Sequence, residues 1–279
     1  MKKINLHLIS DSTGETLGSI ARAVLSQFEN VETNDFIWPL TRTKTQLDKA
    51  LEAITQYPGI VLYTIMQDEF VEQLRKKCHQ LALPCIPVLS HIIAEFSKYL
   101  NMNITHAVGR QHLLDQQYFS RVDAISYTLT HDDGQASFDY YEADIIIIGV
   151  SRTSKSPTSI YLSLRGYKVA NIPFVSMQNI PATIYELKKP LIVGLVINPE
   201  KLVNIRQTRL NSIGENSICD YTDIEKIKSE IAESKKLFAK LQCHVIDVTK
   251  KSVEETSAKI IQLLQDKKLE KSNNTNSHS

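Results

Sequence analysis

Four consecutive isoleucines, Ile145 to Ile148, constrain the fold more than any other feature of this chain. A short β-branched run of this kind is typical of a strand that is buried on both faces of a parallel sheet. Gly149 ends the run, and a small polar loop follows. Pro157 stands where we expect a helix to begin, since a proline at the first helical position loses no hydrogen bond. The order of strand, tight loop and helix predicts a parallel α/β unit.

The loop matches the spacing of a phosphate-binding loop, G-x-x-x-x-G-K-[ST], except that Ser154 replaces the second glycine. Backbone N–H groups at a helix start face an anion, and the helix dipole favours negative charge there. We expect Lys155 to reach the terminal phosphates and Ser156 to hold Mg2+ or a phosphate oxygen. The alternative is a strand-to-helix turn with an incidental lysine. The predicted nucleotide-binding residues are Gly149, Val150, Ser151, Arg152, Thr153, Ser154, Lys155 and Ser156.

The segment GVSRTSKSPTSIYLSLRGYKVANIPFV, residues 149–175, resembles the signature of the bacterial and plant pyruvate, phosphate dikinase regulatory proteins. HLISDSTGETL at 7–17 and AISYTLTHDDG at 124–134 agree with this family in the same order, and the resemblance spans roughly residues 4–265. A sister branch that regulates phosphoenolpyruvate synthase typically has Cys-Gly where this chain has Thr153-Ser154. The Thr-Ser pair therefore points to the dikinase branch.

The resemblance implies a bifunctional enzyme that joins an ADP-dependent serine/threonine protein kinase to a phosphate-dependent pyrophosphorylase. The implied partner is pyruvate, phosphate dikinase, whose threonine accepts and loses the phosphate. The implied small molecules are ADP as donor, inorganic phosphate as co-substrate in reverse, and Mg2+. Three alternatives stay open: the same chemistry on phosphoenolpyruvate synthase, a small-molecule P-loop kinase, and a nucleotide-sensing adaptor without catalysis.

Asp132 and Asp133 form the nearest acidic pair upstream of the loop. Asp-Asp-Gly is ordinary turn chemistry, and the alternation of Ile125, Tyr127 and Leu129 predicts a strand that leads into the turn. A kinase, however, needs a carboxylate to deprotonate the acceptor hydroxyl, and often a second one for Mg2+. With the family resemblance we expect the pair to be catalytic together with the loop lysine. The sequence does not say which carboxylate is the base and which the metal ligand.

The start of the chain has the same order of strand, polar turn and helix. Residues 4–9 indicate a strand, and apolar residues at helical spacing from Leu17 to Phe28 predict a helix with Ser12 or Thr13 as its cap. The resemblance favours a second phosphate site at this helix N-terminus, formed by Ser12, Thr13 and Gly14. A well-capped turn without a ligand is the alternative.

Arg206 and Arg209 lie three residues apart on a helix predicted to begin at Pro199, so we expect them to share a face. They form either a solvated face or a lid that brings guanidinium groups to the phosphates. The metal site is left unknown, because no histidine pair has metal-ligand spacing with a third partner. Four histidines are expected to be surface or core residues: His79, His91, His106 and His112.

The alternation of predicted strands and helices indicates two α/β parts. We predict an N-terminal parallel-sheet domain over residues 1–140 and a C-terminal P-loop kinase-like domain over 141–266, with the border between 135 and 143. The end of the chain, 267–279, is rich in Lys, Asn and Ser and is predicted to be a disordered tail.

Composition excludes several classes of function. With 32 basic and 31 acidic residues, the net charge of +1 favours neither nucleic acid nor membrane. The four cysteines lack metal spacing and are expected to be reduced thiols. No signal-peptide region follows Met1, and no apolar run approaches the roughly 18 to 20 residues of a transmembrane helix. We therefore expect a cytoplasmic protein; its oligomeric state stays open, a homo-oligomer included.

Overall fold

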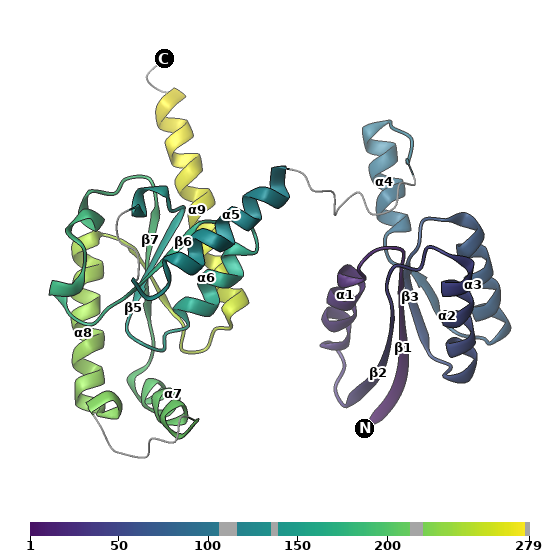
Figure 1. The fold of residues 1–279 in the computed structure, drawn as a ribbon, viewed down its shortest axis with the longest axis horizontal. Coiled ribbons are helices and arrows are strands. Elements are labelled where there is room, and N and C mark those ends of the chain that lie inside the picture. The colour runs from purple at the N-terminus through teal and green to yellow at the C-terminus, as the bar shows by residue number, and fades with distance from the viewer. Residues whose placement is uncertain (106–115, 135–138, 213–219, 277–279) are drawn as a thin grey trace. The chain divides into compact units, whose positions relative to one another are not determined.

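The computed structural model describes residues 1–105, 116–134, 139–212 and 220–276, in two compact units. The first unit comprises Met1–Leu113 and the second Leu114–Ser279. Each unit is built on a four-stranded sheet in which every paired strand is parallel to its neighbour (Figure 1). The α/β class and the parallel sheet predicted from the alternating pattern are therefore confirmed.

In the first unit, strands and helices alternate along the chain, as parallel neighbours require. The sheet order is β2-β1-β3-β4, so the first strand lies inside the sheet. The elements are β1 (Lys2–Ser10), α1 (Glu15–Leu25), β2 (Val31–Trp38), α2 (Lys44–Gln56), β3 (Ile60–Thr64), α3 (Asp68–Gln80), β4 (Cys85–Pro87) and α4 (Ser90–Leu100).

Each face of this sheet has its own cluster of buried side chains, because alternate residues of a strand point to opposite faces. In β3, Val61 and Tyr63 join one cluster, which includes residues of α2 and α3. Leu62, between them, joins the other cluster together with Leu17 and Ala21 of α1. Figure 1 shows α1 on one side of the strands and α2 with α3 on the other.

The second unit has the same strand order in its own numbering, β6-β5-β7-β8. Its sheet is again parallel throughout, with connections that contain helices. The elements are α5 (Gln116–Thr130), η2 (Asp132–Gly134), η3 (Tyr140–Glu142), β5 (Ile145–Gly149), α6 (Lys155–Ser163), β6 (Val169–Pro173), η4 (Met177–Asn179), η5 (Ala182–Glu186), β7 (Leu191–Val196), α7 (Pro199–Ser212), η6 (Asp220–Thr222), α8 (Ile224–Leu241), β8 (His244–Asp247) and α9 (Val253–Asn276), where η marks a short 3-10 helix.

The isoleucine run forms β5, between β6 and β7, as predicted. All four isoleucine side chains are fully buried. Ile147 pairs with Asn171 of β6 on one side and with Val193 of β7 on the other. Because the strands are parallel, their carboxyl ends meet at one edge of the sheet, and the loop that follows β5 lies at that edge.

The strand predicted from the alternation of Ile125, Tyr127 and Leu129 is wrong, because these residues belong to helix α5. The buried side chains recur at helical spacing: Ala124, Tyr127, Thr128 and His131. Leu129, which the alternating pattern placed with Tyr127, is 59% exposed. The short alternation of apolar residues was compatible with either period, and contacts with α6 and β6 selected the helix.

The structure divides the chain earlier than the sequence pattern did. The division falls between Leu113 and Leu114 rather than at 135–143, since α5 makes its contacts with α6 and β6 of the second unit. Residues 267–276, expected to be disordered, continue helix α9. Lys267 secures this part, since its Nζ donates a hydrogen bond to the Pro190 carbonyl at 2.6 Å. Residues 277–279 of the predicted tail lie outside the described residues.

Candidate active site

The loop between β5 and α6 leads from a buried strand to a helix N-terminus, in the order that the sequence spacing predicted. Helix α6 begins at Lys155, two residues before the Pro157 start that the sequence predicted, and Ser154 is its N-cap. Ser154 has φ +61° and Arg152 has φ +71°, a left-handed conformation that glycine adopts at lowest cost. Ser154 thus keeps the backbone conformation expected of the missing glycine, at a cost of about 1 kcal/mol.

Gly149 is required by close packing. A Cβ added there would lie 2.8 Å from Thr153 Oγ1 and 3.0 Å from the Leu195 carbonyl oxygen. Thr153 Oγ1 in turn donates to the Val150 carbonyl at 2.9 Å, which closes the loop on itself. A larger residue at position 149 would therefore displace the loop hydroxyl or the neighbouring strand β7.

Lys155 is the buried cation of this loop, only 5% exposed. Its Nζ donates to the Val150 carbonyl at 3.1 Å. Burial lowers the pKa of Lys155 to about 8; Asp133 and Asp132 oppose the shift, and Arg152 and Arg206 add to it. An anion bound at the loop would stabilise the charged form of Lys155 and would therefore raise its pKa again.

The acidic pair lies near this loop, since Asp132 Oδ1 and Ser156 Oγ both contact the side-chain nitrogen of Asn171. The 3-10 helix η2 carries both carboxylates and contacts β6. Asp132 is half-buried, and its Oδ1 accepts a hydrogen bond from Asn171 Nδ2 at 2.5 Å. Asp133 has φ +50°, and its side chain is exposed. The structure therefore brings together the lysine and the two aspartates that the sequence named.

Asn171 is a residue of this site that the sequence analysis did not name. It lies in β6 and is fully buried. Besides Asp132, its Nδ2 reaches Ser156 Oγ at 3.0 Å and so links the acidic turn to the phosphate loop. The available signal was a single amide within the otherwise apolar run Val169–Ile172. A polar side chain in a buried strand calls for a hydrogen-bonding partner.

The two arginines of α7 do not share an environment. Both lie on the helix that the sequence predicted, but Arg206 is buried and Arg209 is exposed. The guanidinium of Arg206 pairs with Glu230 at 2.7 Å and donates to the Tyr221 carbonyl at 3.0 Å and the Ser151 carbonyl at 3.4 Å. Arg206 therefore contacts the loop through the Ser151 carbonyl, and its guanidinium is already paired with Glu230.

Tyr221 adds a second support for the loop. Its hydroxyl lies 3.2 Å from Ser151 Oγ and 3.4 Å from Arg152 Nε, which donates to it. Its ring lies under the guanidinium of Arg206, with 4.5 Å between the guanidinium carbon and the ring centroid. The loop is therefore held by α7 and η6, elements that follow it by more than forty residues in sequence.

The turn after β1 in the first unit also ends at a left-handed N-cap, but the charges around it differ. Gly14, with φ +82°, is the N-cap of α1, so the expectation that Ser12 or Thr13 caps the helix is wrong. Asp11 is buried, its Oδ2 accepts from the Met66 N–H at 2.9 Å, and Arg42 Nε donates to its carbonyl at 2.7 Å. Burial raises the pKa of Asp11.

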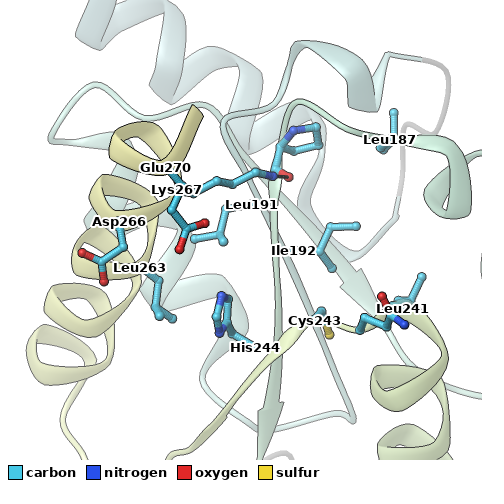
Figure 2. A pocket seen from close by; sticks show the side chains of 12 residues that line it. Leu187, Leu191, Ile192, Leu241, Cys243, His244, Leu263, Asp266, Lys267 and Glu270 are labelled. Atoms are coloured by element: carbon cyan, nitrogen blue, oxygen red, sulfur yellow. Dashed lines mark hydrogen bonds between the residues drawn. The ribbon is translucent and has the colours of Figure 1, made fainter. Parts of the chain in front are cut away.

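A separate cavity of about 410 Å³ lies at the other end of the second sheet (Figure 2). Leu191 and Ile192 line it from the start of β7, His244 from the start of β8, and Asp266 and Glu270 from α9. Ligands of open parallel sheets bind outside the carboxyl ends of the strands, where the phosphate loop lies. We therefore do not assign this cavity to the chemistry of the loop.

Two further features of the described residues bear on the class of site. Within the described residues, no three His, Cys, Asp or Glu side chains gather where they could hold a metal ion. His106 and His112 lie outside the described residues. None of the helices in the described ranges combines the length and apolar character needed to cross a membrane.

Comparison with known proteins agrees with this geometry. The model of the kinase/pyrophosphorylase family matches residues 6–261. A protein of Rhizorhabdus wittichii is 47% identical over 96% of this chain and 97% of its own length. Relatives from Bradyrhizobium sp. and Caulobacter vibrioides are 44% and 45% identical, over 94% and 93% of this chain and 95% and 82% of their own lengths. All three carry the provisional name pyruvate, phosphate dikinase regulatory protein. This chain therefore belongs to the kinase/pyrophosphorylase family and is an enzyme of that family.

Proposed function

We propose that this enzyme regulates pyruvate, phosphate dikinase by adding a phosphate to one of its threonines from ADP and by removing it with inorganic phosphate. The single observation that carries the proposal is the buried Lys155 in the loop after β5, which Asn171 connects to the turn of Asp132 and Asp133. The names of the full-length relatives support the choice of protein partner. ADP as donor rests on the family resemblance.

In the kinase direction, the threonine hydroxyl attacks the β-phosphorus of ADP. The new bond joins the threonine oxygen to that phosphorus, and AMP leaves with the bridging oxygen. We assign the base to Asp133, because its side chain is exposed toward an incoming protein whereas Asp132 is held by Asn171. Lys155 and the loop amides stabilise the charge of the group in transfer.

In the reverse direction, an oxygen of inorganic phosphate attacks the phosphorus of phosphothreonine. The bond to the threonine oxygen breaks, pyrophosphate leaves, and the threonine oxygen regains a proton from Asp133. The same cation and the same carboxylate serve both directions. One site for both activities is the economical assignment, because Lys155 is the loop cation and Glu15 stands at the equivalent helix start in the first unit.

Mg2+ belongs to the proposal as a partner of the nucleotide. Ser156 Oγ and the Asp132 carboxylate offer hard oxygen ligands, the type that Mg2+ prefers. Both oxygens lie within hydrogen-bond distance of the same Asn171 nitrogen, so they are close to each other. When bound, the ion would offset charge on the phosphate oxygens.

The loop of the first unit enters the proposal as a second anion site, formed by Ser12, Thr13 and Gly14, without transfer chemistry. Its support is the left-handed N-cap at Gly14, which leaves the first N–H groups of α1 without a side-chain cap. The position that follows the N-cap carries Glu15 rather than a lysine. A phosphate or a phosphorylated residue of the partner is the ligand of matching charge.

The decisive test uses ADP with a labelled β-phosphate, in nucleotide freed of ATP and adenylate kinase. Label should appear on a threonine of the dikinase, with AMP formed in equal amount. Transfer to phosphoenolpyruvate synthase instead would show that the chain belongs to the sister branch of the family. Transfer only from the γ-position of ATP, or to a small molecule, would replace the proposal with an ordinary P-loop kinase. Binding without transfer would leave a nucleotide-sensing adaptor.

A further inference from the structure

The side-chain amide of Asn171 is buried between two oxygen atoms that both accept its hydrogen bonds. It lies in β6, next to β5, and is fully buried. Its side-chain nitrogen has two protons, and two oxygen partners lie close to it: Asp132 Oδ1 at 2.5 Å and Ser156 Oγ at 3.0 Å. A flipped amide would set its oxygen against the Asp132 carboxylate, so the charge of that group fixes the orientation.

The same residue also holds the acidic turn by its main chain. The Asn171 backbone N–H donates to the His131 carbonyl at 3.0 Å. The turn is therefore fixed at residue 131 by the backbone and at residue 132 by the side chain, both from one strand position. The second partner, Ser156, lies in the first turn of α6. One amide thus connects the acidic turn with the phosphate loop.

Without this amide, Asp132 would have a strong alternative partner. Lys155 is a buried cation and is next in sequence to Ser156, whose Oγ contacts the same Asn171 nitrogen as Asp132 does. Its ammonium group donates a hydrogen bond to the Val150 carbonyl, and within the described part of the chain no ion pair joins it to either carboxylate. A released Asp132 could turn to the ammonium and neutralise the cation that an incoming phosphate needs.

We propose that Asn171 is a positioning residue for phosphoryl transfer: its amide holds Asp132 between β6 and Ser156, keeps Lys155 available to the phosphate, and leaves Asp133 to take the threonine proton. This inference rests on the proposed function. It assigns to Asn171 no contact with the substrate. Its role is to divide two adjacent aspartates into an anchored carboxylate and a free one.

Asn171→Leu tests the role, because leucine has a similar shape, suits a buried strand and cannot donate a hydrogen bond. We expect the kcat of the kinase reaction to fall about 30-fold to 100-fold, the scale of lost acid–base help, and the KM for ADP to rise, because the released Asp132 competes with the phosphate for Lys155. A wild-type kcat in a folded Asn171→Leu protein would overturn the proposal.

A reciprocal exchange separates positioning from mere packing. Asn171→Asp alone sets two carboxylates against each other, whereas the double variant Asp132→Asn with Asn171→Asp restores the hydrogen bond with donor and acceptor exchanged. The double variant should recover at least about tenfold in kcat over Asn171→Asp. No recovery would overturn the proposal. Asn204→Asp, on the exposed side of α7, controls for the added charge of the single variant.

Urea unfolding of the same variants provides a readout that needs no activity. The exchange should restore the midpoint that Asn171→Asp loses, and failure to restore it would count against the hydrogen bond itself. If the wild-type enzyme transfers nothing from ADP, the proposed function fails, and the unfolding midpoints still decide whether Asn171 and Asp132 are coupled. The two failures are therefore distinguishable.

Discussion

The two strand–loop–helix segments of this molecule share a left-handed helix N-cap and differ in charge. Both sheets have the same strand order relative to the chain, and in each unit the helix after the first strand begins at a left-handed N-cap, Gly14 in α1 and Ser154 in α6. Aligned at these caps, Glu15 stands opposite Lys155, and Asp11 stands opposite Ser151. Lys155 is buried, whereas Glu15 is exposed.

The difference shows that loop geometry and loop chemistry are separate properties. A helix N-terminus with free N–H groups attracts anions in either unit. In the second unit a buried cation adds to that attraction, and in the first unit the buried Asp11 carboxylate opposes it. The family name applies to the whole chain, but transfer chemistry is expected only where the cation and the paired aspartates meet.

The largest expected effect comes from removing the cation. Lys155→Met should lower both the kinase and the phosphorolysis rates by about 100-fold or more, because the loss of an electrostatic donor costs on the order of 3 kcal/mol of transition-state stabilisation. Rates in both directions, measured on the same preparation, provide the check. The matched change Glu15→Met should lower either rate less than threefold. If one of the two rates is unchanged in Lys155→Met, that activity does not depend on the loop of the second unit, and the two loops do not differ in the way described above.

The next effect distinguishes the two aspartates. Asp133→Asn should lower kcat by about 100-fold, since asparagine keeps the turn but cannot take a proton. Asp132→Asn should lower it by only about tenfold, because its amide can still bond to Asn171. Thermal unfolding should leave both variants close to the wild type. If both variants turn over as fast as the wild type, Asp132 and Asp133 only form a turn and take no part in the chemistry.

The affinity for ADP should depend on pH through Lys155. Its pKa is about 8 because burial disfavours the charged form, so the ammonium is lost as pH rises through 8. If binding requires the cation, affinity should fall about tenfold between pH 7 and pH 9. Calorimetric titration of ADP at several pH values measures this, and Lys155→Met should flatten the profile. An equally steep profile in that variant would point to another group.

The lowered pKa of Lys155 affects the free energy of unfolding in the opposite direction to ADP affinity. The folded-state pKa lies below the ordinary value of 10.5, so between pH 8 and pH 10.5 the unfolded chain binds more protons at this position. This group's contribution to the free energy of unfolding therefore rises with pH across that window and is unfavourable below it.

The smallest effect compares the two caps directly. Gly14→Ser should lower the free energy of unfolding by about 1 kcal/mol, because a side chain at φ > 0 is strained. Ser154→Gly should raise it by less than about 1 kcal/mol, since relief of strain is offset by the greater freedom of glycine when unfolded. Urea denaturation of the two single variants measures both changes. Changes of the same sign would show that the caps are not equivalent.

Local patterns determined much of what could be known in advance. The isoleucine run, the loop spacing and Lys155 act within about ten residues of each other, and the chain there forms the strand, loop and helix that the pattern predicts. The adjacent acidic pair was also found from the sequence, with help from the resemblance. Its secondary structure was not, because a five-residue alternation fits a strand and a helix alike.

Only the tertiary structure decided which distant residues complete the site. Asn171 meets Asp132, thirty-nine residues away, and Arg206 meets Ser151, fifty-five residues away. No periodicity within a single element encodes such contacts. They follow from which strands are neighbours in the sheet and how the helices pack on it. The physical reason is that propensity and capping act over a few residues, whereas the pairing of β6 with β5 is settled by burial of the whole core.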